Sequence, residues 1–210
     1  MVLTLYTHPM SRGRIARWMC EEVREGAGVE YDTVLLDYGT TMKAPDYLAV
    51  NPMGKVPAIR HDGRVVTEAA AICLYLADAF PAAGLAPPPA ERAAYYRWCL
   101  FAAGPLEAAV TNASFGFAVE GPEAEGRAGY GSLAAVADAL HGWLRDRPYV
   151  CGEAFTAADV YVGAAVGWGL QFRTLPERPS FKAYAERTAS RPAALRAREI
   201  DDGLTGAGGG

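Results

Sequence analysis

The sequence predicts two domains of different class, an α/β domain followed by an all-α domain. Strand and helix patterns alternate over residues 1–80, whereas residues 90–202 show helical patterns only. Between them, PAAGLAPPP (81–89) has four prolines and no charge, which is typical of a linker. The last stretch, GLTGAGGG (203–210), is expected to form a flexible tail without a functional role.

The first half of the α/β domain is predicted as strand, helix, strand, short helix. VLTLY (2–6) is a short apolar run that ends in a proline-containing turn, as a buried strand does. A helix is expected from Ser11 to about Arg24, where apolar residues recur at helical spacing: Ile15, Trp18, Met19 and Val23. YDTVLL (31–36) predicts a second strand, and KAPDYLAVNP (43–52) predicts a short helix that closes before its last proline.

The second half is predicted as a hairpin and a helix. In KVPAIRHDGRVVTE (55–68), VPAIR and RVVT flank an Asp62-Gly63 pair, which strongly favours a tight turn. An amphipathic helix follows from Glu68 to about Ala79. The order β-α-β-α-β-β-α is that of the thioredoxin-like fold. Its last two strands must be antiparallel, because the hairpin between them is short, whereas a crossover helix joins parallel strands.

Ala-rich helical patterns fill the second domain, at residues 90–120, 122–147, 156–173 and 180–190. FTAADV (155–160) predicts the start of a buried helix. Thr156 can cap this helix, and Asp159, three residues later, can accept a hydrogen bond from the backbone of the cap. We interpret this box as a folding signal with no functional role.

The composition is that of an ordinary soluble globular protein, with 51% hydrophobic residues, 21% charged residues and a net charge of −4. No run of Lys or Arg suggests a nucleic-acid surface, and no apolar stretch reaches the roughly 18 residues that a membrane span needs. The N-terminal MVLTLYTHP lacks the pattern of a secretory signal, so a cytoplasmic location is expected.

Neither the cysteines nor the histidines form a recognisable metal or redox motif. The four cysteines contain no CxxC pair and are expected to remain buried thiols: Cys20, Cys73, Cys99 and Cys151. The three histidines show no ligand spacing, so no metal is expected.

Ser11, in the turn HPMS (8–11), raises the main functional question. A nucleophilic serine needs an adjacent base and an orienting acid, and only His8 is close in sequence, with no GxSxG elbow. A plain helix cap is the simpler interpretation, since serine is among the best N-capping residues.

Four segments, in this order and spacing, resemble the soluble glutathione S-transferases. HPMS is similar to the strand-to-helix turn of the serine-type enzymes, especially the plant phi class and its bacterial relatives. KAPDYLAVNPMGKVPAI (43–59) is similar to the family's second helix and cis-proline strand. TEAAAICLYLADAFP (67–81) resembles its glutathione-anchoring turn and third helix, and FTAADV resembles the capping box of its core helix.

The resemblance implies that the Ser11 hydroxyl donates a hydrogen bond to the sulfur of bound glutathione and favours its thiolate. Arg12, and less so Arg14, could add positive potential. Tyr6 is the rival hydroxyl, but it falls inside the first strand and is expected in the core.

The resemblance also implies a set of glutathione-binding residues. A cis bond between Val56 and Pro57 would turn the backbone of Val56 towards a peptide ligand, a form of β-strand addition. It would also place the proline, which lacks a backbone N–H donor, at the end of the strand and not within its hydrogen-bonded part. Glu68 would meet the ammonium of the γ-glutamyl group, and the Ala69 N–H its carboxylate. Ala69 replaces the family's usual serine, which costs one hydroxyl donor, about 0.5–1.5 kcal/mol. Two lysines would approach the glycine carboxylate, Lys55 first and Lys43 second.

The second substrate is expected to be a small hydrophobic electrophile, bound between the thiol and the helical domain. Candidate lining residues are Phe115, Phe117, Trp168 and Phe172. The family implies a two-fold homodimer. Two alternatives stay open: a glutathione-dependent disulfide or peroxide reductase, which a cysteine in place of Ser11 would favour, and a non-catalytic binding or assembly module. Ser11, Lys55 and Glu68 argue against the second alternative, and Ala69 gives it some weight.

Overall fold

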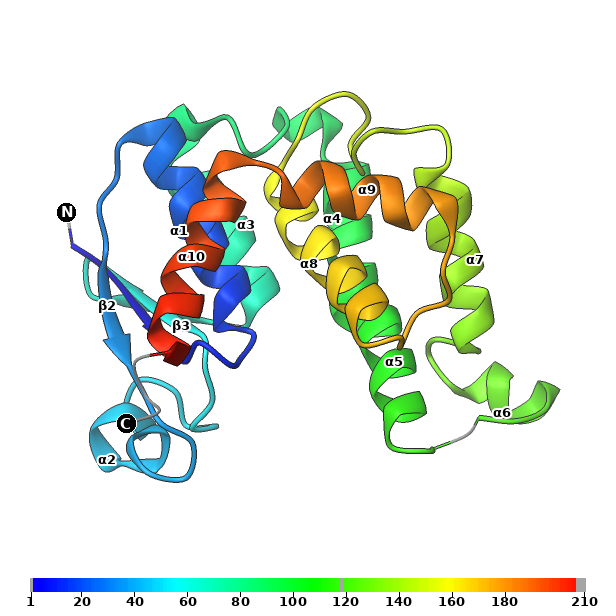
Figure 1. Ribbon diagram of the computed structural model, residues 1–210, viewed down its shortest axis with the longest axis horizontal. Helices are drawn as coiled ribbons and strands as arrows, with labels where there is room; N and C mark the ends of the chain where they lie inside the picture. The colour runs from blue at the N-terminus through cyan, green and yellow to red at the C-terminus, as the bar shows by residue number, and fades with distance from the viewer. Residues whose placement is uncertain (1, 118, 207–210) are drawn as a thin grey trace. The chain divides into compact units, whose positions relative to one another are not determined.

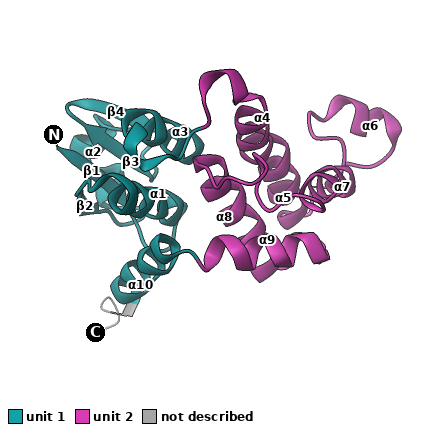
Figure 2. Cartoon of the chain, turned by 90° about the horizontal axis from the view of Figure 1, so that it is seen from above, with its two compact units in different colours: residues 1–86, 191–210 teal, residues 87–190 magenta. Residues whose placement is uncertain are grey.

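The structure, a computed structural model, describes residues 2–117 and 119–206 and divides the chain into two compact units (Figures 1 and 2). Unit 1 comprises residues 1–86 together with residues 191–210, and unit 2 comprises residues 87–190. None of the helices in the described part of the chain is long and apolar enough to cross a membrane.

Unit 1 contains a four-stranded mixed sheet in the order β2-β1-β3-β4. The strands are β1 (Leu3–Thr7), β2 (Asp32–Leu35), β3 (Ala58–His61) and β4 (Arg64–Thr67). β2 runs parallel to β1, and β3 runs antiparallel to β4, as the sequence predicted; β3 is also antiparallel to β1. Asp62 and Gly63 make the hairpin turn with φ of 47° and 83°, a left-handed conformation that explains the Asp-Gly pair.

Four helices accompany this sheet: α1 (Gly13–Ala27), α2 (Pro45–Leu48), α3 (Ala69–Ala79) and α10 (Pro192–Gly206). The first helix begins two residues later than predicted. The expected short helix at 43–52 is instead a 3-10 turn, η1 (Thr41–Lys43), followed by α2. The order of strands and helices over residues 1–80 is otherwise that of the thioredoxin-like prediction.

Helix α1 is buried on two faces. Apolar side chains such as Ile15 and Met19 are at most 3% exposed. The charged side chains Arg17, Glu21 and Glu22 are also at most 3% exposed. They are buried because α10 packs along this second face of α1 (Figure 1).

Ion pairs hold α10 on α1. Arg17 Nε donates to Asp201 Oδ1 at 2.7 Å, and both side chains are buried. Arg191 donates to both carboxylate oxygens of Glu22 at 2.7 and 2.6 Å. Arg196 donates to Glu21 at 3.3 Å.

The position of α10 differs from the domain boundaries that the sequence predicted. Residues 192–202 were expected in the helical domain, and residues 203–210 as a flexible tail. In the structure, Arg191 onward belongs to unit 1, and the helix continues to Gly206. Residues 207–210 lie outside the described part of the chain. The physical reason is the charged face of α1, whose partners lie on α10 and cannot be identified from spacing within either helix.

Unit 2 is helical, as predicted. Its helices are α4 (Ala93–Phe101), the π-helical η4 (Ala102–Leu106), α5 (Glu107–Ser114), α6 (Pro122–Arg127), α7 (Leu133–Leu144), α8 (Ala157–Gln171) and α9 (Pro179–Ala189). The helix expected over 90–120 thus stops at Ser114. The segment expected as a linker contains two short 3-10 turns, η2 (Pro81–Ala83) and η3 (Pro89–Glu91).

The capping box at the start of α8 is present as predicted. The Asp159 carboxylate accepts from the Thr156 N–H at 2.9 Å. Its other oxygen accepts from the Val150 N–H and from the Tyr184 hydroxyl, both at 2.8 Å. Burial raises the pKa of Asp159, and these donors oppose that shift. This network anchors the core of unit 2.

We predict that Asp201→Ala destabilises the protein by about 3–5 kcal/mol, because it leaves the buried Arg17 charge without its partner. Urea unfolding followed by circular dichroism measures this free energy. The matched control is Glu30→Gln, which removes the exposed ion pair between Arg24 of α1 and Glu30 in the segment after this helix and should cost less than about 1 kcal/mol. Equal losses in the two variants would contradict the role given to Asp201.

Candidate active site

The predicted glutathione-binding residues lie at one edge of the sheet in unit 1, meaning here the end of the strands at which β1 and β4 finish and β3 begins. Ala58 of β3 pairs with Tyr6 of β1 on one side and with Thr67 of β4 on the other. Because β3 is antiparallel to both, β1 and β4 run in the same direction. Their carboxyl ends, from which the chain continues to α1 and α3, therefore lie at the same edge as the amino end of β3.

Ser11, Val56 and Glu68 lie just beyond these three strand ends. Neighbouring strands are about 4.8 Å apart, so β1, β3 and β4 together span about 10 Å. An extended tripeptide also spans about 10 Å. The edge therefore has the width that a tripeptide such as glutathione requires.

The Ser11 hydroxyl has two backbone partners. Its Oγ donates to the His8 carbonyl at 2.6 Å and accepts from the Gly13 N–H at 2.9 Å. His8 Nδ1 accepts from the Met10 N–H at 3.1 Å and is not engaged with Ser11. The Ser11 hydroxyl thus holds the first N–H of α1, one residue before the N-cap Arg12, and the arrangement does not resemble a nucleophile with its base.

Gly13 brings the start of α1 close to β1. A Cβ atom at this position would lie 1.9 Å from Thr7 Oγ1 and 2.9 Å from Ser11 Oγ, so only glycine fits. The first turn of α1 contains no acidic residue, while it begins beside the exposed Arg12. The N-terminus is the positive end of the helix dipole, and arginines there add to it. The turn therefore has a positive potential that suits an anion.

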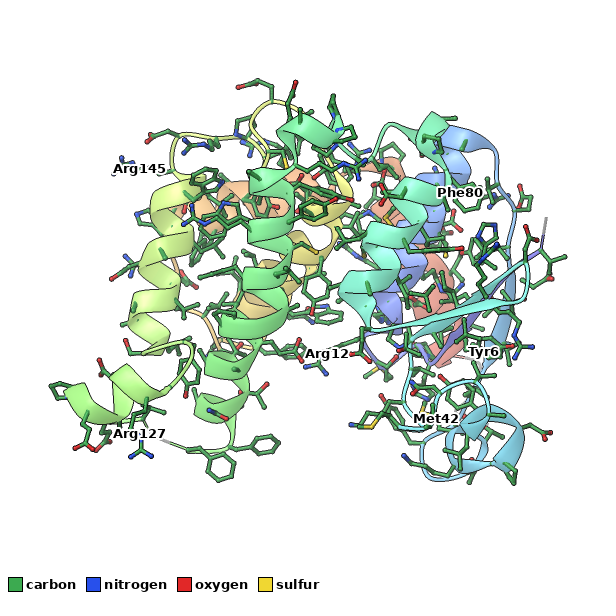
Figure 3. The ribbon with its side chains drawn as sticks, turned by 180° about the vertical axis from the view of Figure 1, so that it is seen from behind. Tyr6, Arg12, Met42, Phe80, Arg127 and Arg145 are labelled. Atoms are coloured by element: carbon green, nitrogen blue, oxygen red, sulfur yellow. The ribbon has the colours of Figure 1, made fainter. Side chains whose placement is uncertain are left out.

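Tyr6 lies on the opposite face of the sheet. Thr7 faces α1, and successive side chains of a strand point to opposite faces, so Tyr6 points away from α1. Its half-buried ring packs beside Met42 and 5.6 Å from the Tyr47 ring (Figure 3). Tyr6 is thus packed against a core cluster, as expected, although it is not fully buried.

Two side chains that the sequence did not single out hold the chain before β3. The Tyr47 hydroxyl and Asn51 Nδ2 both donate to the Lys55 carbonyl, at 2.6 and 2.8 Å. Burial raises the pKa of Tyr47 to about 12, so this hydroxyl stays protonated and acts as a donor. Both residues belong to the DYLAVN stretch, which signalled only a helix. The next peptide bond, Val56-Pro57, is cis as predicted.

The two candidate lysines have different surroundings. Lys43 Nζ donates to the Met53 and Gly54 carbonyls at 3.1 and 2.9 Å, so its ammonium ties η1 to the following loop. The side chain of Lys55 is exposed at the same loop. This difference separates a structural lysine from one that can turn to a ligand.

Glu68 has an unusual backbone at the junction of β4 and α3. Its φ is 66° and its ψ is 116°, a conformation that non-glycine residues rarely adopt and that concentrates at functional sites. Its side chain is exposed, and α3 begins at the next residue, Ala69. The first N–H groups of α3 have no acceptor within the helix, as at any helix start. A carboxylate can bind them.

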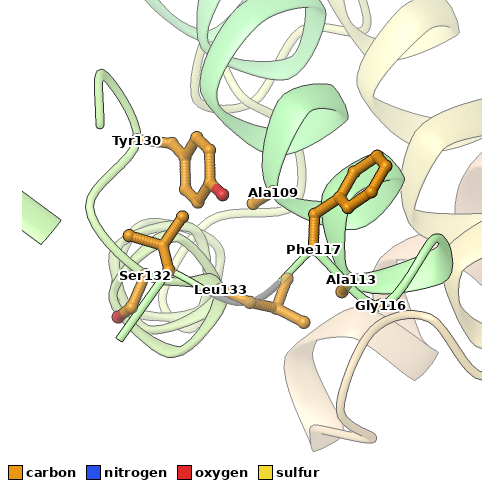
Figure 4. Close-up of a pocket in the computed structure, with 8 residues that line it drawn as sticks. Ala109, Ala113, Gly116, Phe117, Tyr130, Ser132 and Leu133 are labelled. Carbon is orange, nitrogen blue, oxygen red and sulfur yellow. The ribbon is translucent and has the colours of Figure 1, made fainter. Parts of the chain in front are cut away.

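The four aromatic candidates of unit 2 are not gathered into one cluster. Phe115 and Phe117 follow α5, with ring centroids 5.9 Å apart, and both are exposed. Trp168 is half-buried within α8, and Phe172 is exposed just after that helix. Phe117 alone of the four lines a pocket of about 260 Å³ (Figure 4). This pocket also involves Ala109, Tyr130 and Leu133 among its lining residues.

The comparisons with known proteins identify the family. A model of the glutathione S-transferase N-terminal domain matches residues 1–78, and a model of the C-terminal domain matches residues 97–192. A glutathione S-transferase of Escherichia coli O157:H7 is 31% identical over 167 residues, which cover 78% of this chain and 79% of the relative. The chain belongs to the glutathione S-transferase family.

Other glutathione S-transferases agree with this. One from Zea mays is 30% identical over 210 residues, covering 91% of this chain and 90% of that protein. A crystal structure of a glutathione transferase from Methylococcus capsulatus superposes with a TM-score of 0.76 and 31% identity, covering 97% of this chain and 100% of that one. A sphingomonad glutathione S-transferase, complexed with glutathione, superposes with a TM-score of 0.74 and 29% identity, covering 95% and 98%.

Family membership confirms the predicted fold and the predicted reaction class. The chain is a transferase with glutathione as its co-substrate. Within the described residues, no group of three or more His, Cys, Asp or Glu side chains could hold a metal ion.

We predict that Tyr47→Phe weakens glutathione binding by removing one donor from the Lys55 carbonyl. One hydrogen bond is worth about 1 kcal/mol, so the KM for glutathione should rise about fivefold, with little change in kcat. Tyr75→Phe is the matched control, because it removes a hydrogen bond to His61 at the opposite edge of the sheet. An unchanged KM in Tyr47→Phe would show that the orientation of this carbonyl does not matter for binding.

Proposed function

We propose that this glutathione transferase uses Ser11 to stabilise the thiolate of bound glutathione, which then attacks a small hydrophobic electrophile. The observation that carries the proposal is the shared sheet edge. There, the start of α1, the chain before β3 and the start of α3 lie next to one another, at the spacing of an extended tripeptide.

In this proposal the γ-glutamyl group binds at the start of α3. Its ammonium meets the Glu68 carboxylate, and its carboxylate accepts from the Ala69 N–H. The backbone N–H and C=O of Val56, followed by Pro57, pair with the central residue of glutathione. Lys55 neutralises the glycine carboxylate, whereas Lys43 supports the loop, because its ammonium already has two carbonyl partners.

The thiol then points to the turn that contains Ser11. A free thiol with a pKa of about 8.5 is only a few per cent ionised at pH 7, and lowering that pKa by about two units needs roughly 2.7 kcal/mol. One charge-assisted hydrogen bond and a helix N-terminus supply about this much. The Ser11 proton turns from the His8 carbonyl to the sulfur, while the Gly13 N–H continues to hold the Ser11 oxygen. Arg12 adds positive potential.

The chemical step forms one carbon–sulfur bond. The thiol proton leaves to solvent, the sulfur donates an electron pair to the electrophilic carbon, and a leaving group such as halide departs with its bonding pair. We propose that Phe115, Phe117, Trp168 and Phe172 contact this second substrate. The apolar pocket beside Phe117 supports a hydrophobic class of electrophile.

Two alternatives remain distinguishable by experiment. Reductase chemistry through Cys20 or Cys99 is disfavoured, because burial raises the pKa of both thiols to about 12. A non-catalytic role is disfavoured by the hydroxyl at Ser11 and the strained backbone at Glu68. Retention on glutathione resin without turnover of an aromatic halide would support the binding module, and turnover of a glutathione mixed disulfide alone would support the reductase.

A homodimer and a cytoplasmic location complete the proposal. Tyr96 and Leu100 are 43% and 60% exposed on α4, which suits an apolar interface. Sedimentation at micromolar concentration should give about twice the 22.3 kDa mass of the chain. The matched variant Leu100→Glu should shift the equilibrium towards monomer. A wild-type species of 22.3 kDa would contradict the dimer.

We predict that Ser11→Ala shifts the pH profile of kcat/KM towards alkaline values and leaves glutathione affinity nearly unchanged. Loss of the proposed thiolate stabilisation, up to about two pKa units, should lower the rate at neutral pH by about one to two orders of magnitude. The capping loss costs only about 1 kcal/mol of stability. The assay is conjugation of a generic aromatic halide across pH, with calorimetry of glutathione binding.

Ser190→Ala is the control, since it removes a serine that bonds a backbone carbonyl at the end of α9. It should leave the profile unchanged. If Ser11→Ala also keeps the wild-type profile, another group activates the sulfur. If Ser11→Ala is inactive at every pH and the wild type forms a covalent adduct, Ser11 is a nucleophile. Ser11→Cys should lose conjugation and gain mixed-disulfide chemistry.

A further inference from the structure

We propose that Arg14 and Asp202 are positioning residues for Ser11, so that the C-terminal helix α10 is part of the thiol-activating site. The proposal rests on the proposed role of Ser11. It assigns a function to a helix that lies at the far end of the chain from the turn it supports, within the same unit.

The turn before α1 is held by side chains at three successive carbonyls. The His8 carbonyl accepts from Ser11 Oγ at 2.6 Å, and the Met10 carbonyl accepts from the Tyr38 hydroxyl at 3.2 Å. Between them, the Pro9 carbonyl accepts from Arg14 Nε at 2.5 Å. Arg14 therefore holds the peptide unit that directly follows the carbonyl to which Ser11 is bonded.

The second contact of Arg14 is with α10. A second guanidinium nitrogen, Nη2, donates to Asp202 Oδ1 at 2.6 Å, and the Arg14 side chain is 25% exposed. A guanidinium is a rigid planar fork, so the two contacts together determine its position and orientation. A lysine has the same charge but cannot reproduce this pair of contacts.

The helix backbone that carries Asp202 is held in place, although the Asp202 side chain itself is 57% exposed. The preceding residue, Asp201, is buried against Arg17, which lies one helical turn after Arg14 on α1. α10 is thus anchored on α1 independently of the turn. The Arg14 side chain connects Asp202 on this fixed helix to the Pro9 carbonyl in the turn.

A purely electrostatic role for Arg14 makes different predictions. If Arg14 acted only by its charge, Arg14→Lys would behave like the wild type, and Asp202→Ala would increase the local positive potential and lower the thiol pKa. In the positioning role, both substitutions release the turn and raise the thiol pKa. The two interpretations therefore differ in sign for Asp202→Ala.

The experiment compares Arg14→Lys, Asp202→Ala and Asp202→Glu with the wild type. It measures the pH dependence of kcat/KM, the KM for glutathione and the ultraviolet thiolate absorbance of the binary complex. Arg14→Lys should raise the apparent thiol pKa by about one unit and lower kcat/KM at neutral pH about tenfold, with the KM for glutathione within about twofold. Asp202→Ala should shift in the same direction by a smaller amount, and Asp202→Glu should restore most of the loss.

Arg196→Gln is the matched control. It removes ion pairs between the same two helices, with Glu21 and Glu25, but makes no contact with the turn. It should lower stability and keep the pH profile. A shift equal to that of Asp202→Ala would mean that any loosening of α10 has this effect, and would overturn the proposal.

A double variant separates this proposal from the role of Ser11. If Arg14 acts through the hydroxyl, Arg14→Lys should add nothing in the Ser11→Ala background. Additive effects, a wild-type profile in Arg14→Lys, or a lowered thiol pKa in Asp202→Ala would each overturn it. A Ser11→Ala variant with the wild-type profile would instead refute the thiolate role of Ser11, whatever Arg14→Lys does.

Discussion

The antiparallel placement of β3 between β1 and β4 brings the starts of α1 and α3 and the chain before β3 to one edge of the sheet, which is the proposed glutathione site. Because β3 is antiparallel to both β1 and β4, these two strands run in the same direction. Helices α1 and α3 consequently start at one edge. The first N–H groups of each helix have no hydrogen-bond acceptor within that helix. The chain that enters β3 passes between them. A ligand with an anion at each of two sites and a peptide backbone between them matches this edge.

The charged face of α1 is the second constraint, since it requires a partner helix. A buried ion pair such as Arg17–Asp201 gains little net stability over an apolar contact, because both groups lose their hydration. Its value is specificity: an unpaired Arg17 would be very unfavourable, so the pair selects one position of α10 on α1. The neighbouring Arg14–Asp202 contact depends on that selection. In this way the residue that fixes the position of α10, Asp201, and the residue proposed to position the turn, Asp202, are consecutive on one helix.

The chemistry assigned to this site uses the ligand's sulfur and not a protein thiol. Cys20 lies in α1 itself, yet burial raises its pKa to about 12, so it is unreactive at neutral pH. The protein instead supplies a hydroxyl, a helix start and arginines. In the proposed mechanism each contributes a modest free energy, and together they supply the roughly 2.7 kcal/mol that a two-unit change in thiol pKa requires.

Local signals in the sequence determined most of the fold and the candidate site. The Asp62-Gly63 turn and the Thr156 and Asp159 box involve residues close together in the chain, so spacing and residue type identify them, whereas the cis Val56-Pro57 bond followed from the resemblance of its segment to the family. Tertiary structure alone decided that Lys43 is committed to neighbouring carbonyls and that α10 joins unit 1. It also brought Arg14 to Asp202, 188 residues away. Such pairs depend on which surfaces meet when the chain folds, and a charged residue on a helix carries no local mark of whether it will face water or a partner.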